Sequence, residues 1–250
     1  MPTLVFDCET IPDIPTYAAL LQLPDSTPPV DLEAAWTAAE RPFKPALQRI
    51  ISLAAAWITD DGTLQRLRTL GPDEPTAIQQ FFHTIAQSHP VITGWNTSGF
   101  DVPVLLTRAL VHHIPIGDFY TIGLPYEGYL KRYGERYHRD LMDLQAHYGA
   151  TTRLSLDEMA TLLGIPGKLT THGDSVSALY QAGAIDSIHA YCQHDVLTTA
   201  WIYARIATHR GWWNPDTLQQ FEASARHWVT TQPEPHWAEW ITAAQDRRLW

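Results

Sequence analysis

Cysteine is scarce in this chain. The 250 residues contain only two cysteines, Cys8 and Cys192. Two cysteines provide no disulfide framework, and without a Cys-x-x-Cys pair the usual cysteine-based zinc site is excluded. The 12 histidines offer no spaced ligand pair either, because His112 and His113 are merely adjacent. We therefore expect neither a disulfide-rich scaffold nor a zinc protein.

Lysine is also rare, and the overall charge is negative. Lys44, Lys131 and Lys168 are the only lysines, and the 17 Lys and Arg residues face 27 Asp and Glu, which gives a formal net charge of -10. A protein that coats nucleic acid would be basic, so the charge argues against that role. It does not exclude an enzyme that holds a nucleic acid in one local groove.

Long apolar runs are missing as well. No stretch approaches the roughly 18 apolar residues of a membrane span, and no basic-then-apolar leader precedes the first strand. We expect a soluble, cytoplasmic protein without a membrane partner. A hydrophobic content of 45% is sufficient for a proper core, so the length predicts one large domain or two small ones.

The order of the predicted elements indicates an α/β domain. Strands are expected at residues 4–12, 49–58, 63–70 and 91–95, and at the start of 138–148. Helical patterns cover residues 76–88, 101–113, 155–164 and 186–209, a short stretch after 175, and two Trp-rich segments near the end. The proline-rich residues 12–45 suggest an irregular excursion around one helix at 31–40. Together these elements predict a mixed sheet with helices packed on it.

Two carboxylates, Asp7 and Glu9, interrupt the first apolar strand. Because side chains alternate along a strand, both point to one face, roughly 7 Å apart, while Cys8 points to the other. Like charges on a buried face repel each other and lose hydration, which a bound cation offsets. Hard oxygen ligands suit Mg²⁺ or Mn²⁺. The alternative is a strand that ends at Asp7 and turns Glu9 toward solvent.

Asp101 is the second candidate, because it follows the strand at residues 91–95 and precedes a helix. In open α/β sheets, ligands bind at this edge. The alternative is that Asp101 caps the helix, since Asp is a favoured N-cap residue. The two roles are compatible, because a cap uses only one carboxylate oxygen.

The third candidate is the pair Tyr191 and Asp195, which lie one turn apart on the long predicted helix. Asp is unfavourable in mid-helix, and apolar residues surround this one, so we expect it to be partly buried and to need a partner such as a metal ion. The alternative is an exposed Asp on the polar side with Gln193 and His194.

Taken together, these residues resemble the motifs of the DEDD 3′–5′ exonucleases, in the subclass with a tyrosine. Residues 4–12, 94–105 and 191–195 are similar to motifs I, II and III, and residues 140–144, 155–158 and 164–168 resemble the stand-alone group related to the exonuclease domain of family B DNA polymerases. The resemblance covers roughly residues 3–209. Ala190 occupies the position where the histidine subclass carries its His.

This resemblance implies a ribonuclease H-like fold, with a mixed five-stranded sheet flanked by helices. Residues 1–210 would form the 3′–5′ exonuclease domain, and residues 211–250 a C-terminal helical extension on the same domain. The implied activity is metal-dependent hydrolysis at the 3′ end of a single strand, with DNA favoured over RNA. The oligomeric state does not follow from the sequence.

The resemblance also implies a role for each site residue, with two divalent cations, Mg²⁺ or Mn²⁺, as cofactors. Asp7 would bridge both ions, Glu9 and Asp195 would complete the shell of the first, and Asp101 would hold the second. Tyr191 would orient the attacking water. Two such ions activate water and stabilise the leaving 3′ oxygen.

Contacts to the strand are expected from residues near the motifs. By resemblance, Thr10 and Ile11 contact the terminal nucleotide. Asn96 and Phe100 flank motif II and are candidates for sugar or base contacts, although Phe100 is equally suited to the core. Lys168 is a candidate phosphate ligand, with a solvated loop lysine as the alternative.

A tyrosine-rich stretch, residues 126–139, alternates tyrosines with Lys and Arg. Aromatic rings and positive charge suit single-strand binding. The spacing of Tyr129, Tyr133 and Tyr137 equally predicts one buried helical stripe.

Two other function classes compete with the exonuclease. A phosphatase with an Asp nucleophile usually has a second Asp two residues later, where this chain has Glu9. A nucleic-acid binding module of the same fold would be expected to have lost at least one of the carboxylates. Neither cysteine needs a catalytic role, so we expect both to be packed side chains.

Overall fold

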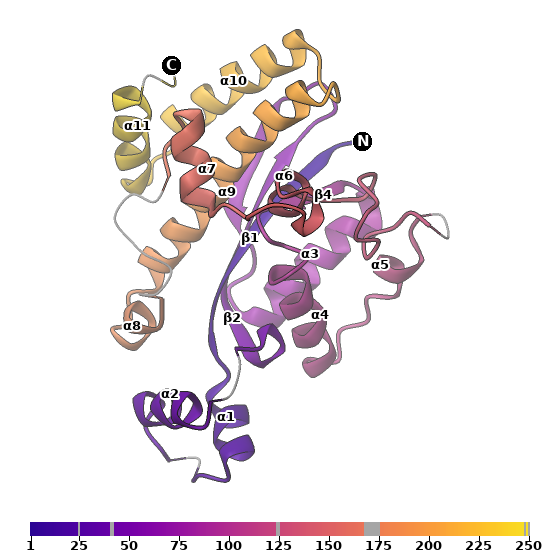
Figure 1. The fold of residues 1–250 in the computed structure, drawn as a ribbon. Coiled ribbons are helices and arrows are strands. Elements are labelled where there is room, and N and C mark those ends of the chain that lie inside the picture. Colours follow the sequence, from indigo (N-terminus) through magenta and orange to yellow (C-terminus); the bar gives the residue numbers. More distant parts are fainter. Residues whose placement is uncertain (25, 41–42, 124–125, 168–175, 248, 250) are drawn as a thin grey trace.

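A mixed five-stranded sheet lies at the centre of the protein (Figure 1). The computed structural model describes residues 1–24, 26–40, 43–123, 126–167, 176–247 and 249. The strands are β1 (Thr3–Pro12), β2 (Gln48–Ile58), β3 (Leu64–Thr69), β4 (Val91–Gly94) and β5 (His138–Asp140), in the spatial order β3-β2-β1-β4-β5. β1 pairs antiparallel with β2 and parallel with β4, which confirms the predicted mixed sheet.

β1 is the central strand, and its side chains alternate between two cores. Val5 belongs to the core on one face, whereas Phe6 and Cys8 belong to the core on the other. Asp7 and Glu9 therefore share the face of Val5, as the alternation predicts.

β4 is much shorter than β1, and this difference creates the edge where the site lies. The two strands pair only from Thr3↔Val91 to Val5↔Thr93. Asp7 consequently lies beyond the carboxyl end of β4, next to the chain that leaves this strand. This is the edge at which open α/β sheets bind ligands.

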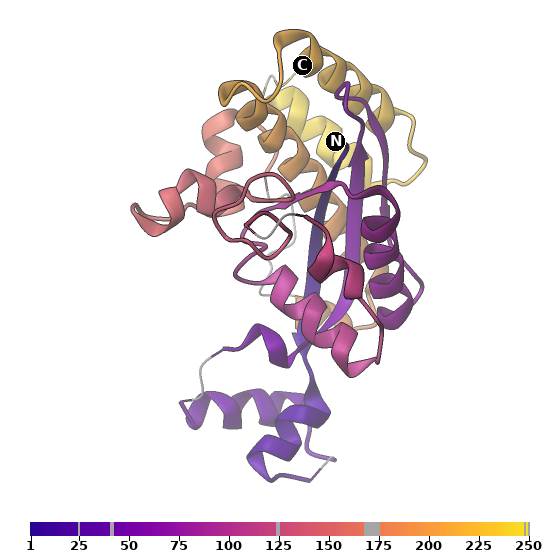
Figure 2. The ribbon, with the colours of Figure 1, turned by 90° about the vertical axis from the view of Figure 1, so that its right-hand side faces the viewer.

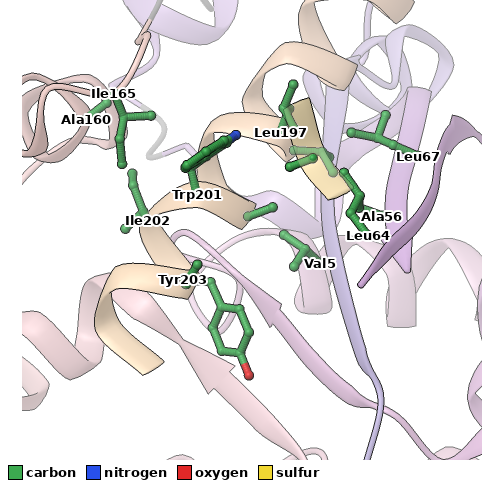
Figure 3. Close-up of a cluster of buried hydrophobic side chains, with 14 of the residues drawn as sticks. Val5, Ala56, Leu64, Leu67, Ala160, Ile165, Leu197, Trp201, Ile202 and Tyr203 are labelled. Atoms are coloured by element: carbon green, nitrogen blue, oxygen red, sulfur yellow. The ribbon is translucent and has the colours of Figure 1, made fainter. Parts of the chain in front are cut away.

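The long helix α9 (Ile185–His209) covers one face of the sheet and supplies much of its core (Figures 1 and 3). Trp201 and Ile202 of this helix belong to one core cluster together with Val5 and with Leu67 of β3. Three further helices contribute to the same cluster, namely α7 (Leu156–Leu163), α10 (Pro215–Thr230) and α11 (His236–Asp246). The C-terminal helices thus share a core with α9, while the division of the chain at residue 210 stays a prediction.

The opposite face of the sheet is covered by α3 (Glu74–Ser88), α4 (Asp101–Val111) and α5 (Gly117–Thr121). Its core is aromatic: Phe6 of β1 lies 4.8 Å from Phe81, and Phe82 meets Phe119 edge-on at 5.2 Å. Both faces of β1 are therefore buried, which fixes the strand that carries Asp7.

A pair of short helices, α1 (Ile14–Leu21) and α2 (Pro29–Ala38), extends from one end of the sheet between β1 and β2 (Figures 1 and 2). The rings of Tyr17 and Trp36 join them, with centroids 4.1 Å apart. The expectation of a single helix here was wrong. Pro15 lies in the first turn of α1, where proline starts a helix instead of breaking it.

The smaller elements are the 3₁₀ turns η1 (Pro45–Leu47) and η2 (His147–Gly149) and the helices α6 (Leu141–Gln145) and α8 (Val176–Gln181). Ser155 and Glu158 form the predicted capping box of α7. Within the described ranges, no helix is both long enough and apolar enough to cross a membrane.

Candidate active site

Asp7 lies at the centre of a group of carboxylates. Its pKa is raised well above the usual value, first by burial and then by the negative charges of Asp101, Glu9 and Asp195. A charge acts on a pKa in this way only at short range. The structure thus brings together all four acidic residues that the sequence singled out, from β1, the start of α4 and the middle of α9.

Asp101 is 2% exposed and is directed toward β1. Its Oδ1 accepts a hydrogen bond from the backbone N–H of Cys8 at 3.0 Å. Burial raises the pKa of Asp101 to about 7, although the hydrogen bonds from Cys8 act in the opposite direction. Phe100, not Asp101, is the N-cap of α4, and no side chain caps this helix. The N-cap interpretation of Asp101 is therefore wrong.

Tyr191 and Asp195 face the same group from α9. They are 7% and 8% exposed, so the alternative of a solvated Asp195 is wrong. Burial, the charges of Asp195, Glu9 and Asp7, and a hydrogen bond to Asp195 all raise the pKa of Tyr191. The phenol therefore stays protonated at neutral pH, and its hydroxyl group lies against the carboxylates.

Cys192 contacts the site, which the sequence did not reveal. Its thiol donates to the backbone oxygen of Asp7 at 3.3 Å and lies 3.8 Å from Oδ2 of the same residue. One ligand atom each from Asp7, Glu9 and Cys192 lie within 4.8 Å of one another. Both cysteines are buried, as expected for packed side chains, but both also hold site residues in place. Only the position of Cys192 next to Tyr191 hinted at this contact.

The loop between β4 and α4 is held by Asp140. This carboxylate accepts hydrogen bonds from the backbone N–H groups of Asn96 and Ser98, at 3.1 and 2.8 Å, and also caps α6. Asn96 adopts a positive φ of 63°. At Gly94 a Cβ would lie 2.8 Å from the backbone oxygen of Phe6 and would also overlap Thr97. Glycine at this position therefore lets the loop approach β1 closely.

The predicted strand-binding residues lie in different environments. Thr10 and Ile11 continue β1 beyond a register shift after Glu9. Ile11 is only 6% exposed and packs in a small cluster with Tyr191, so its side chain supports the site from within. Phe100 is half-buried against the core under α4. Lys168 lies outside the described residues.

The tyrosine-rich stretch does not form one helical stripe. Tyr129 is buried and stacks on Phe119 at 4.9 Å, whereas Tyr126 and Tyr133 are 89% and 73% exposed. The residues follow turns, with no helix between Thr121 and β5 in the part that is described, so a four-residue period does not gather them on one side. The interpretation as a buried helical stripe is wrong.

Arg132, from the same stretch, pairs with Asp143 at 3.3 Å, and Arg153 does so at 2.9 Å. Both line a cavity of about 320 Å³ next to the Asn96 loop. Asp143 thus acts as a counter-ion for arginines, not as a member of the carboxylate group.

The donor set fits hard divalent cations. Asp7 and Asp101 are surrounded by like charge, and in the described part of the chain no Lys or Arg forms an ion pair with either of them. Carboxylate oxygens crowded in this way are favourable ligands for Mg²⁺ or Mn²⁺. The thiols of Cys192 and Cys8 are softer groups nearby, the first beside Asp7 and the second hydrogen-bonded to Asp101.

Comparison with known proteins identifies the family of the chain. Residues 41–244 match a family model described as a predicted 3′–5′ exonuclease related to the exonuclease domain of PolB. No curated protein matches the sequence.

The fold is similar to that of a solved DNA polymerase structure. The family B DNA polymerase from the hyperthermophilic archaeon Pyrobaculum calidifontis is 17% identical over 98% of this chain, with a TM-score of 0.55. The chain spans 27% of that polymerase. E. coli exonuclease I in complex with a 5cy-dT13 oligonucleotide is 14% identical over 87% of this chain and 42% of its own, with a TM-score of 0.42.

Proposed function

The chain belongs to the family of predicted 3′–5′ exonucleases related to the exonuclease domain of PolB, and from this membership we propose that it hydrolyses phosphodiester bonds at the 3′ end of single-stranded nucleic acid. We further propose that DNA is preferred over RNA and that the reaction requires Mg²⁺ or Mn²⁺.

One observation carries the proposal: half-buried Asp7 lies so close to Asp101, Glu9 and Asp195 that the charge of each of them raises its pKa. Four carboxylates gathered at one sheet edge destabilise the protein unless a cation binds them. A binding module without catalytic activity would have no need for this arrangement. The acidic residues, with Tyr191 beside them, are therefore best explained as catalytic groups.

Asp7, Glu9, Asp101 and Asp195 would hold two divalent cations. When bound, these ions would neutralise charge at the scissile phosphate and activate the attacking water. Asp7 lies closest to the centre of the group and is the proposed shared ligand. Cys192 would hold Asp7 in place through the hydrogen bond to its backbone oxygen.

Tyr191 is proposed to orient the water. Its hydrogen bond to Asp195 uses the phenolic hydrogen, because a carboxylate only accepts. The phenol oxygen would accept a hydrogen bond from the water and thereby direct a lone pair of the water toward the phosphorus. The water would form the new P–O bond and lose a proton to solvent as the P–O3′ bond breaks, and the 3′ oxygen would leave with a proton from solvent.

The decisive experiment follows the length of 5′-labelled strands. Single- and double-stranded DNA and RNA are incubated with Mg²⁺, with Mn²⁺ or with EDTA. We expect stepwise shortening of single-stranded DNA with either cation and none with EDTA. Asp7→Ala and Asp195→Ala should each abolish it, whereas Asp186→Ala, an exposed position on the same helix, should not.

The same assay separates the competing functions. A binding module would retain the strand without shortening it. A phosphatase would release phosphate from a small phosphomonoester and leave the strand length unchanged. Full activity of both Asp7→Ala and Asp195→Ala would overturn the assignment of the site.

A further inference from the structure

Phe43 is an exposed aromatic residue that contacts Phe100 at the start of α4, next to Asp101. It lies on the segment that leads from α2 to η1, and it is 62% exposed. Its ring centroid is 5.9 Å from that of Phe100, and the two planes differ by only 16°. Phe100 immediately precedes Asp101, whose carboxylate is bound to β1. The exposed ring therefore contacts the residue that precedes a proposed metal ligand in the chain.

Phe100 holds the ring of Phe43 in place by stacking on one of its faces. Phe100 is half-buried and packs against the core under α4, so its position is fixed by that core. Phe43 stacks on it with one face, and the high exposure of Phe43 leaves its other face to solvent. A ring that is already held in place loses little conformational freedom when another planar group stacks on it.

Charge next to Phe43 indicates what kind of planar group this is. Lys44 follows directly and is exposed, and it is one of only three lysines in an acidic chain. Among the residues that the structure describes, no carboxylate forms an ion pair with Lys44. An aromatic face beside an available cation is what a single strand requires, because its bases stack and its phosphates need counter-charge.

We propose that the outward face of Phe43 stacks a nucleobase near the 3′ end of the bound strand, and that Lys44 pairs with a neighbouring phosphate. This inference rests on the proposed exonuclease function. Every base has a π face, so this contact contributes affinity without sequence preference. It would hold the end of the strand while the terminal phosphodiester lies at the carboxylates.

The first test compares Phe43→Ala, Phe43→Trp and Val30→Ala. Val30 is 64% exposed on α2 and serves as the control for loss of an exposed apolar side chain. KM is measured on 5′-labelled single-stranded DNA, and Kd is measured by fluorescence anisotropy in EDTA. We expect Phe43→Ala to raise both constants about tenfold. Phe43→Trp should keep them near wild type, and Val30→Ala should leave them unchanged.

The second test asks whether the effect comes from a base. A strand with abasic nucleotides at its 3′ end has the phosphates but nothing to stack. Wild type should bind this strand about tenfold more weakly, and Phe43→Ala should cause no further loss. Additive effects of the abasic sites and of Phe43→Ala would overturn the proposal.

A matched variant separates the loss of the aromatic ring from a general loss of apolar packing. Phe43→Leu keeps an apolar side chain but no aromatic ring, and it should raise KM as much as Phe43→Ala does. Equal KM and Kd for wild type and both variants would refute the stacking contact. A wild type that never shortens the strand would refute the exonuclease function, while the anisotropy comparison would still decide on Phe43.

Discussion

The backbone N–H of Cys8 donates a hydrogen bond to Oδ1 of Asp101, with 3.0 Å between the two atoms. Cys8 lies between Asp7 and Glu9 on β1, so this bond fixes the start of α4 against the strand that carries the other carboxylates. Asp101 therefore has a structural function that needs only an acceptor oxygen. It also contributes negative charge, which is unfavourable in a buried position without a cation.

Asp101→Asn should separate these two functions. The amide oxygen can still accept from Cys8, while the buried charge is lost. The folded-state pKa of about 7 lies above the ordinary value of 3.8, so the folded protein holds this proton more tightly. In EDTA, the contribution of Asp101 to stability therefore falls as the pH rises from about 4 to about 7. The free energy of unfolding of Asp101→Asn should therefore rise by about 2 kcal/mol relative to that of wild type between pH 5 and pH 8.

Urea unfolding midpoints at both pH values measure this difference. Asp216→Asn, at an exposed position in the first turn of α10, serves as the control and should follow wild type at both. Addition of Mg²⁺ should reduce the advantage of Asp101→Asn, because a bound cation offsets the charge. Parallel pH profiles for wild type and Asp101→Asn would contradict the prediction.

Tyr191→Phe should reduce turnover more than it weakens strand binding. The ring would still pack on Ile11, but the oxygen proposed to orient water would be gone. We expect kcat to fall about 100-fold, with KM within about threefold of wild type. Steady-state rates on labelled DNA give both constants. Tyr180→Phe removes a hydroxyl from the same cluster and should change neither; a loss of affinity at constant kcat would contradict the role of Tyr191.

Much of the candidate site was predictable because its residues obey local rules. Alternation along a strand puts Asp7 and Glu9 on one face, and the helical period puts Tyr191 one turn before Asp195. The mixed sheet followed in the same way from the order of the elements. Each of these inferences needs only residues close together in the chain.

Contacts between distant residues were not predictable. Cys192 reaches the backbone of Asp7 across 185 positions, and Asp140 holds the Asn96 loop across 44. The helical pattern of Tyr129 and Tyr133 was misleading, because the segment follows turns that no local spacing reveals. Packing between elements decides these positions.

Arg108→Ala should strongly destabilise the protein. Arg108 is 6% exposed and donates to Glu74 at 2.8 and 2.7 Å and to Asp13 at 2.8 Å. Burial alone would raise the pKa of Glu74, but hydrogen bonds from Arg108, Ile50 and His112 lower it overall. Without the guanidinium, Glu74 would remain as a poorly compensated buried charge, at a cost of about 3–5 kcal/mol.

Urea unfolding at neutral pH measures the effect of Arg108→Ala. The matched control is Arg66→Ala, since Arg66 is exposed on β3. This variant should change the free energy of unfolding by less than about 0.5 kcal/mol. Asp13 is the N-cap residue of α1, so Arg108→Ala should also expose the α1–α2 segment to proteolysis. Equal midpoints for the two arginine variants would show that the network contributes little.

His194 should make the protein sensitive to acid through α11. Its Nε2–H donates to the backbone oxygen of His236 at 3.1 Å, and its ring meets Trp237 at 5.3 Å. Burial, and then the neighbouring His236, lower the pKa of His194 to about 4 from 6.5. The unfolded chain therefore binds this proton more readily than the folded protein does. The contribution of neutral His194 to stability is fully present above about pH 6.5 and is lost as the pH falls toward 4.

His194→Gln keeps a hydrogen-bond donor but does not titrate, and this separates the charge from the contact. Relative to this variant, wild type should lose about 2 kcal/mol between pH 7.5 and pH 5, measured as urea midpoints. The tryptophan fluorescence of α11 should change in the same transition, because Trp237 packs on the His194 ring. This slope is opposite in sign to that of Asp101, so Asp101→Asn should steepen the loss of stability in acid. If His194→Gln and wild type lose stability equally on acidification, His194 is not the responsible group.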